Sequence, residues 1–352
     1  MYGTAGQTHI QTSESPEIVS KTRKAVALFS GGLDSLLTLA ILSRLGIETL
    51  GLHFRSWFLV PKYRDFDTFP EEVQERGFTI LHRDISHEYT RILLHPRYGR
   101  GRGANPCIDC KLFFLVKARE LMVERGASFV ATGEVLGQRP MSQQSHIMEL
   151  LERRSGLEGF LLRPLSAKLL SPTIPEELGW IDRNYLYDIH GRGRKRQMEL
   201  ARQFGIEEYP PPAGGCLLTQ PSCGKRFFDL VKYTESPSDE DLLILKYGRH
   251  FRIGEDCKLV VGKDEEENSY LESIPWGNVT FFPISPKGPF GRMKWDGDRE
   301  NLLTALMVIA RYCSTSRETL TVRVLVGFGD REEEMLYTGI PDRDGIKSML
   351  IH

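Results

Sequence analysis

The 352-residue sequence contains no apolar run long enough to cross a membrane and no recognisable signal peptide. Its 46 basic and 47 acidic residues nearly cancel, so the overall charge favours no class of partner. We find no internal repeat, no low-complexity tract and no H-x-x-H or H-E-x-x-H spacing, and so assign none of the nine histidines to a metal. These absences predict a cytoplasmic protein with no membrane partner.

Cysteine is also sparse, with six residues in the chain. In a reducing compartment such cysteines are metal ligands, catalytic thiols or core residues rather than disulfides. At this length we expect two domains. The boundaries that we predict are a mobile tail at 1–22, a first domain at 23–235 and a smaller domain at 236–352.

The most informative stretch is a serine- and glycine-rich turn between an apolar strand and an apolar helix. Two glycines let the backbone approach phosphates, and the first turn of the helix presents free N–H groups to them. Asp34 is the odd member, because a carboxylate repels phosphate unless a divalent cation lies between them. We therefore expect Mg²⁺ near Asp34. The residues of the turn are Ser30, Gly31, Gly32, Leu33, Asp34 and Ser35.

The turn lacks the lysine of a Walker A loop, which disfavours a kinase-like or GTPase-like nucleotide site. Ser-Gly-Gly-x-Asp-Ser resembles the PP-loop of the N-type ATP pyrophosphatases. The resemblance implies ATP as a cofactor, cleaved between its α and β phosphates, and adenylation of a carbonyl oxygen. It does not identify the acceptor.

Strand-like and helix-like segments alternate through the first half of the chain. They predict an α/β fold, a Rossmann-like parallel sheet (adenine nucleotide α-hydrolase-like, by the resemblance) with helices on both faces, followed by a smaller α+β domain. Ligands bind beyond the carboxyl ends of such strands. The strands that we expect in the first domain are 25–29, 48–54, 79–85, 129–132 and 159–165.

The resemblance implies further ATP contacts at these strand ends. The second strand end, with His53 and Phe54, would grip adenine through backbone groups. Gly133, in a segment similar to the family's Ala-Thr-Gly-His, would flank ATP, although Glu134 replaces the family's histidine. A basic residue after the fifth strand would approach the phosphates, with Lys168 the first candidate and Arg163 the second; a salt-bridged surface lysine is the competing interpretation.

The second informative stretch is Asn-Pro-Cys-x-x-Cys at 105–110. C-x-x-C places two sulfurs within reach of one metal, and the start of a helix should lower the pKa of the thiols. Cys216 follows a Gly-Gly pair 106 residues after Cys110. Three sulfur ligands would leave a four-iron cluster with one open iron.

These cysteines are similar to those of tRNA thiolases of the ThiI/MnmA/TtuA type, over roughly residues 24–230. The resemblance implies a 4Fe–4S cluster on Cys107, Cys110 and Cys216, or a persulfide relay without a cluster, with Cys110 and Cys216 catalytic beside Asp34. Alternatives are a structural zinc that also uses Cys223, a redox pair and inert thiols. A sulfur donor, sulfide or a persulfide carrier, would be a partner.

Basic residues open a helix at 191–197, where their charges oppose the helix dipole, so we expect phosphate contact there, to ATP or RNA. The segment 247–268 resembles the RNA-associated R domain of NFACT proteins, which implies RNA contact through Arg249, His250, Arg252 and Lys263. The competing interpretation is a domain that only packs on the first or mediates a homodimer. The residues assigned to RNA are Arg192, Arg194, Lys195 and Arg249.

Together these patterns predict an ATP-dependent tRNA sulfurtransferase. One enzymatic alternative is a PP-loop sulfurtransferase or desulfidase that acts on a small molecule or a thiolated base. Another is ligation of the lysidine-synthetase type, which needs no thiols. The non-enzymatic alternative is an RNA-binding adaptor with a vestigial nucleotide fold.

Overall fold

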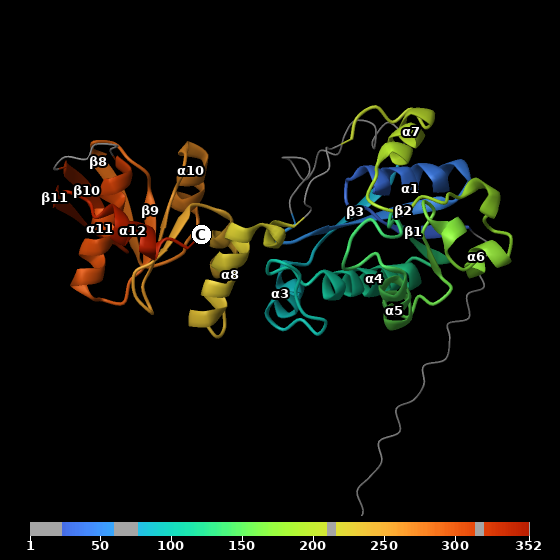
Figure 1. The fold of residues 1–352 in the computed structure, drawn as a ribbon, viewed down its shortest axis with the longest axis horizontal. Helices are drawn as coiled ribbons and strands as arrows, with labels where there is room; N and C mark the ends of the chain where they lie inside the picture. The colour runs from blue at the N-terminus through green and yellow to red at the C-terminus, as the bar shows by residue number, and fades with distance from the viewer. Residues whose placement is uncertain (1–22, 60–76, 210–215, 314–319, 352) are drawn as a thin grey trace, which may run out of the picture.

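The structure, a computed structural model, describes residues 23–59, 77–209, 216–313 and 320–351. It has two lobes that lie next to each other along the long axis (Figure 1). The tail expected at 1–22 and the glycine pair before Cys216 fall outside the described residues.

A parallel five-stranded sheet forms the centre of the first lobe, in the order β3-β2-β1-β4-β5. The middle of β1 is fully buried because β2 and β4 flank it on its two edges, with Val26 opposite both Leu50 and Val130. This confirms the predicted α/β fold. The strands are β1 (Lys24–Leu28), β2 (Glu48–Arg55), β3 (Thr79–Asp84), β4 (Phe129–Thr132) and β5 (Leu161–Leu162).

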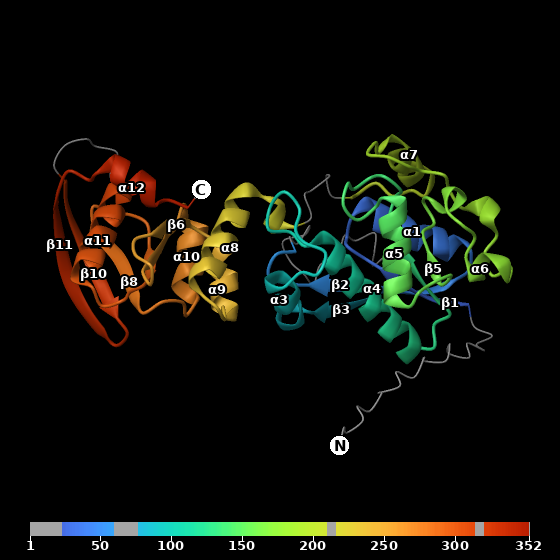
Figure 2. The same cartoon turned by 60° about the horizontal axis from the view of Figure 1, so that its bottom comes forward.

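Helices cover both faces of this sheet, as an all-parallel sheet requires. Two separate hydrophobic cores result, one beneath α1 and α7 and the other beneath α3, α4 and α5 (Figures 1 and 2). The helices are α1 (Leu33–Arg44), α3 (Ser86–Leu94), α4 (Cys107–Glu124), α5 (Ser145–Ser155), α6 (Ile174–Glu177) and α7 (Lys195–Gln203).

The strand order reverses between β1 and β4. At such a switch point the connections leave the carboxyl edge toward opposite faces and open a crevice there. The turn after β1 and the residues after β4 therefore meet at one edge. Helix α4 runs back to the start of β4, so its N-terminus lies at this same edge, on the other face from α1.

The second lobe is the predicted smaller α+β domain. Its six-stranded sheet has the order β11-β10-β8-β9-β7-β6, with every pair antiparallel. Helix α11 packs against β8 and β10 over an apolar core. The elements are β6 (Arg249–Arg252), β7 (Lys258–Val261), α10 (Glu265–Ser273), β8 (Val279–Ser285), β9 (Gly291–Lys294), α11 (Arg299–Cys313), β10 (Leu320–Phe328), β11 (Arg331–Gly339) and α12 (Arg343–Met349).

Two helices, α8 (Pro221–Tyr233) and α9 (Asp239–Leu243), connect the lobes. Leu242 contributes to the core shared with α3 and α4, while Asp229 of α8 forms ion pairs with Arg252 and Lys258 of the second sheet. The domain boundary expected at 235/236 falls between these two helices.

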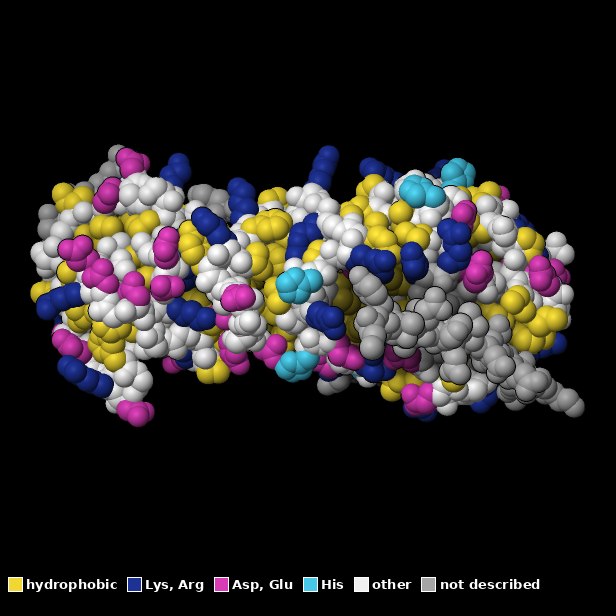
Figure 3. Space-filling model, turned by 90° about the horizontal axis from the view of Figure 1, so that it is seen from below, with side chains coloured by type: hydrophobic (Ala, Val, Ile, Leu, Met, Phe, Trp, Pro, Cys, Tyr) yellow, Lys and Arg dark blue, Asp and Glu magenta, His cyan; other side chains and the backbone are white. Residues whose placement is uncertain are grey.

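The surface carries no single charged face in the view of Figure 3, where Lys and Arg side chains alternate with Asp and Glu over both lobes. This agrees with the balanced composition. Within the described part of the chain, no helix is both long and apolar enough to cross a membrane.

A buried ion-pair network holds the loop after β4 in place. The Arg163 guanidinium donates to Glu134 at 3.2 Å and to Glu152 at 2.7 Å, and Lys111 lies 3.5 Å from the other oxygen of Glu134. Burial opposes ionisation of Glu134, but the positive charges of Lys111 and Arg163 outweigh it and lower the pKa of this carboxyl. Arg163 is thus a structural residue, and its expected approach to ATP phosphates is wrong.

We predict that Arg163→Met lowers the free energy of unfolding by about 3 kcal/mol at pH 7, because the buried Glu134 loses its guanidinium partner and keeps only Lys111 at 3.5 Å and the Thr132 hydroxyl. Urea unfolding followed by circular dichroism measures the change. Arg153→Met, at an exposed position of α5, is the matched control and should shift it by less than about 0.5 kcal/mol. A loss of that small size in the Arg163 variant would contradict the role of the network.

Candidate functional site

The predicted phosphate turn lies between β1 and α1 and is held by its own serines. Gly31 adopts φ +70°, a left-handed conformation that suits glycine. The Ser35 hydroxyl donates to Gly32 O at 2.7 Å and accepts from the Ser30 N–H at 3.3 Å. No described side chain caps the N-terminus of α1. The first turn of α1 is therefore available to an anion.

Asp34 lies in the first turn of α1 and presents one oxygen without a partner. Its Oδ2 accepts from the Gln138 amide at 3.1 Å, whereas Oδ1 is buried and has no hydrogen-bond partner among the described residues. A buried, unsatisfied carboxylate oxygen costs free energy unless a ligand engages it. Carboxylate oxygen is the ligand type that Mg²⁺ takes, so this residue fits the predicted ion.

Gly133, directly after β4, allows the strand end to press against this turn. A Cβ atom built at this position would lie 2.5 Å from Asp34 O and 2.8 Å from Ser35 N, both backbone atoms that cannot move aside. Only glycine permits this approach. The structure therefore brings Gly133 to the predicted phosphate turn.

The end of β2 lies beside the turn. His53 Nδ1 is 2.9 Å from Phe29 O, and its ring lies edge-on to His82 with centroids 5.4 Å apart. The Phe54 ring is buried and stacks on Phe114 at 4.7 Å. Since that side chain packs against α4, a ligand at this edge can meet Phe54 only through its backbone.

Cys107, Cys110 and Cys216 converge from two distant parts of the chain. Cys107 begins α4, and Cys110 lies in its first turn. Cys216 is positioned from the other side, because Leu217 donates its N–H to Phe58 O at 2.9 Å and Ala104 donates to Leu218 O at 3.0 Å. The buried Tyr89 hydroxyl forms a hydrogen bond with Cys110. All three sulfurs are close enough to Tyr89 to raise the pKa of its hydroxyl.

Within the described ranges, however, no three His, Cys, Asp or Glu side chains are placed as a metal-binding group. The chemistry of the donor set fits an iron–sulfur cluster, since cysteine sulfur is its usual ligand and Cys110 and Cys216 pack, half-buried, against apolar side chains. The positions of the sulfurs do not by themselves form a coordination site.

For Cys110, the expectation that the helix N-terminus lowers the thiol pKa is wrong. Burial raises the pKa of Cys110 to about 12, although the hydrogen bond from Tyr89 and the charge of Lys111 oppose the change. Burial also raises the pKa of Cys216 to about 12 and that of Cys223 to about 11. Desolvation exceeds the dipole here because the sulfurs are enclosed by apolar side chains.

One loop, residues 135–144, touches both parts of the site. Gln138 bonds to Asp34 at the turn, and Met141 Sδ lies 3.8 Å from the Asn105 amide. That same amide donates to Cys107 Sγ at 3.0 Å. The phosphate turn and the cysteines thus lie at one edge of the sheet and are linked by a short chain of contacts.

The remaining residues that we predicted to contact ATP phosphates or RNA lie away from the phosphate turn. Lys168 contacts Asn184 O at 3.1 Å in a cleft whose wall includes Arg44, at the end of α1 opposite to the turn. Arg192, Arg194 and Lys195 stand together before and at the start of α7.

Arg249 lies in the second lobe, where it donates to Gly262 O and covers the Tyr312 ring. Two further expectations of RNA contact from this lobe are wrong: His250 is fully buried and bonds to Tyr247 O, and Arg252 makes two hydrogen bonds to the Asp229 carboxylate. Lys263 is paired with Glu267.

Tyr89 was not predicted from the sequence. It lies one turn into α3 without any motif around it, and only the fold brings it to the cysteines. Gln138 lies six residues after the end of β4, and this position beyond a strand end predicts from the sequence that it borders the site.

Comparison with known proteins supports both resemblances. Residues 248–344 match the family model of the NFACT protein RNA binding domain. The chain is 32% identical over 138 residues to a tRNA-specific 2-thiouridylase MnmA of Geobacter metallireducens, which covers 33% of this chain and 36% of that protein. It is 28% identical over 158 residues to a tRNA-5-methyluridine(54) 2-sulfurtransferase of Thermus thermophilus, with 44% of each chain covered.

A solved structure, described as a predicted subunit of a tRNA methyltransferase from Methanocaldococcus jannaschii, is 20% identical over 40% of this chain and 68% of that one. Its TM-score of 0.28 is too low to bear on fold or function. The chain spans between 36% and 44% of the length of the two curated relatives named above. The resemblances to tRNA thiolases and to the NFACT RNA-binding domain are therefore confirmed for parts of the chain.

We predict slow alkylation of Cys110 and Cys216 by iodoacetamide in the folded protein. Because the pKa of each thiol is raised from 9.0 to about 12, the reactive thiolate is roughly a thousandfold scarcer at pH 8. The rate should rise about tenfold per pH unit up to at least pH 10. Peptide mapping by mass spectrometry measures it, with the urea-unfolded chain as control. A plateau below pH 9 in the folded protein would contradict the prediction.

Proposed function

We propose that this chain is an ATP-dependent tRNA sulfurtransferase, which adenylates a base carbonyl and then exchanges that oxygen for sulfur. The observation that carries the proposal is the loop 135–144, which bonds to the phosphate turn through Gln138 and reaches Cys107 through Met141 and Asn105. Similarity to tRNA-specific 2-thiouridylases over about a third of the chain supports the same assignment.

In the first step, ATP phosphates would lie on the N–H groups and hydroxyls of residues 30–35, with adenine at the backbone of His53 and Phe54. Mg²⁺ at Asp34 would supply neutralisation of the phosphate charge. A uridine or cytidine carbonyl oxygen attacks the α-phosphorus, and pyrophosphate leaves with the electron pair of the broken P–O bond. The base oxygen then belongs to AMP, which is a good leaving group.

In the second step, sulfide bonds to the base carbon; where a persulfide is the donor, its outer sulfur forms this bond, and a second cysteine thiol then forms a disulfide with the inner sulfur, which breaks the S–S bond and releases the thiolated base. The bond from that carbon to the AMP oxygen breaks, AMP leaves with its electron pair, and a proton is released. Cys107, Cys110 and Cys216 would hold the sulfur-bearing group. A 4Fe–4S cluster on them would supply an open iron for exogenous sulfide.

The raised thiol pKa values favour a cluster over a persulfide relay. A buried thiol with a pKa near 12 is a weak nucleophile at neutral pH, whereas coordination to a metal removes its proton outright. The second lobe, matched by the NFACT RNA-binding family, would contribute to tRNA binding, as would Arg192, Arg194 and Lys195. The target base must leave its stack to reach the edge.

We expect the alanine variants of Cys107, Cys110 and Cys216, purified without oxygen, to lose tRNA thiolation at least about 100-fold. They should retain tRNA-stimulated pyrophosphate release within roughly threefold, because the turn is intact. Asp34→Asn should lose pyrophosphate release by about 100-fold as well. Thiolated nucleosides and pyrophosphate are measured separately, together with iron, sulfide and zinc content.

Cys223→Ala is the matched control and should keep both activities and the bound metal. Loss of metal in that variant, with one zinc in the wild type, would indicate a structural S₄ site instead. Full thiolation by all three cysteine variants would exclude sulfur chemistry at these residues. Absence of tRNA-stimulated pyrophosphate release from the wild type would favour an RNA-binding adaptor.

A further inference from the structure

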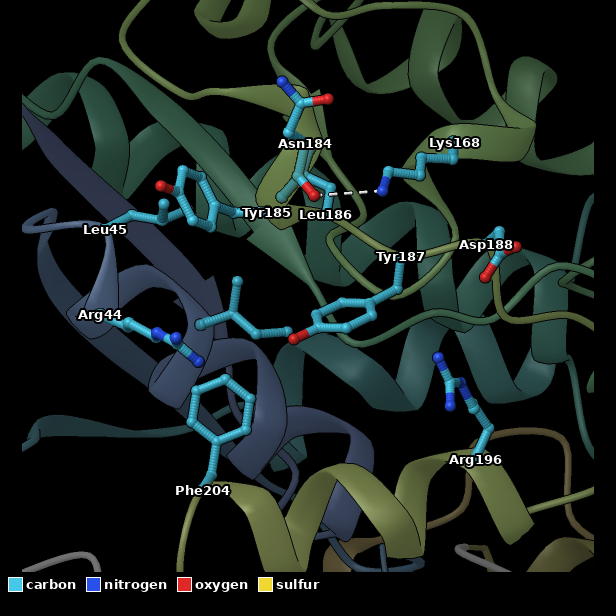
Figure 4. Close-up of a pocket in the computed structure, with 11 residues that line it drawn as sticks. Arg44, Leu45, Lys168, Asn184, Tyr185, Leu186, Tyr187, Asp188, Arg196 and Phe204 are labelled. Atoms are coloured by element: carbon cyan, nitrogen blue, oxygen red, sulfur yellow. Dashed lines mark hydrogen bonds between the residues drawn. The ribbon is translucent and has the colours of Figure 1, made fainter.

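A cleft of about 400 Å³ opens at the end of α1 opposite to the phosphate turn. Its lining comes from the C-terminal end of α1, from residues 184–188 and from α7 and the residue after it. In Figure 4 Arg44, Lys168 and Arg196 reach into the cleft from different sides, the Tyr187 ring lies between the two arginines, and Tyr185 lies beside Leu45. This volume suits a single nucleotide.

Positive charge dominates the cleft. Arg44 and Lys168 are exposed and form no ion pair among the described residues, and Arg196 has only a 3.3 Å pair with Glu199 on its own helix. Asp188 is the one carboxylate in the lining. Lys168 donates to Asn184 O, which fixes its side chain at the rim without neutralising it.

Aromatic surface is exposed beside these cations. Tyr185 is 57% exposed and is the last residue of a short 3₁₀ turn that Asp182 caps, so its backbone position is fixed while its ring stays open to solvent. A positively charged groove with an exposed ring is the arrangement by which proteins hold single-stranded nucleic acid, with phosphate on the cations and a base stacked on the ring.

The chain itself connects the cleft to the proposed reaction site. The basic residues Arg192, Arg194 and Lys195 precede Arg196 along the chain and extend the positive charge toward the carboxyl edge of the sheet. There, Gly191 donates its N–H to Leu136 O at 2.7 Å, two residues before Gln138, which bonds to Asp34. α1 itself is about 18 Å long, so the path spans more than one nucleotide.

We propose that this cleft binds one nucleotide of the RNA substrate, its phosphate on Arg44, Lys168 and Arg196 and its base stacked on Tyr185. The inference rests on the proposed function and adds a second contact point, which would hold nucleotides flanking the target base at a fixed distance from the turn. It assigns Lys168 to RNA rather than to the ATP phosphates.

The test is tRNA binding by the full chain at several salt concentrations. The double variant Arg44→Ala/Arg196→Ala should reduce the slope of log affinity against log salt by about 0.7 to 0.9, since it removes the neutralisation of one phosphate and each phosphate contributes roughly that much. Arg153→Ala/Arg154→Ala, which removes the same charge from exposed positions on α5, is the matched control and should leave the slope unchanged.

Tyr185→Ala should weaken tRNA binding roughly tenfold, and Tyr185→Trp should restore it, because stacking needs only an aromatic face. If wild type binds tRNA and the double variant has an unchanged slope, the cleft assignment is overturned while the proposed function stands. If wild type does not bind tRNA, both are overturned. AMP binding that depends on Tyr185, without any effect of these variants on tRNA, would make this a free-nucleotide site and overturn the RNA assignment.

Discussion

The close approach of Gly133 to the first turn of α1 is the constraint on which the site depends. It occurs where the strand order reverses, so it joins the two halves of the sheet at the edge where ligands bind. Any side chain at residue 133 would meet the backbone of Asp34 and Ser35. The loop that follows can then place Gln138 on Asp34 and Met141 near the cysteine segment.

The buried network around Glu134 explains how this loop keeps its position. The Glu134 carboxylate forms ion pairs with Arg163 and Lys111, and Lys111 directly follows Cys110 in the sequence. The same side chains therefore hold the loop and the start of α4 together. Glu134 replaces the histidine of the family that this chain resembles. It lies at the centre of an ion-pair cluster, so its role here is structural.

Desolvation sets the state of the thiols. Enclosed by apolar side chains and Tyr89, Cys110 and Cys216 keep their protons at neutral pH, although α4 begins beside them. A helix dipole contributes at most a few kcal/mol and is screened near the surface, whereas burial of a charge costs more. Such a pocket suits thiols whose protons are displaced by a bound group.

The sequence by itself determined the parallel sheet, the phosphate turn and its carboxyl-edge neighbours, because periodicity and turn chemistry are local properties. It did not predict β6, β9 or β11: two of these strands have four residues, and β11 carries three consecutive glutamates that resemble a solvated segment. Only the tertiary structure decided which basic residues are free. No local pattern distinguishes Arg163, His250 and Arg252 from other basic residues. Arg163 and Arg252 are nevertheless paired with carboxylates far along the chain, and His250 is fully buried. Burial and pairing are long-range properties, so the pKa of the thiols and the accessibility of the cations follow from the fold and not from the local pattern.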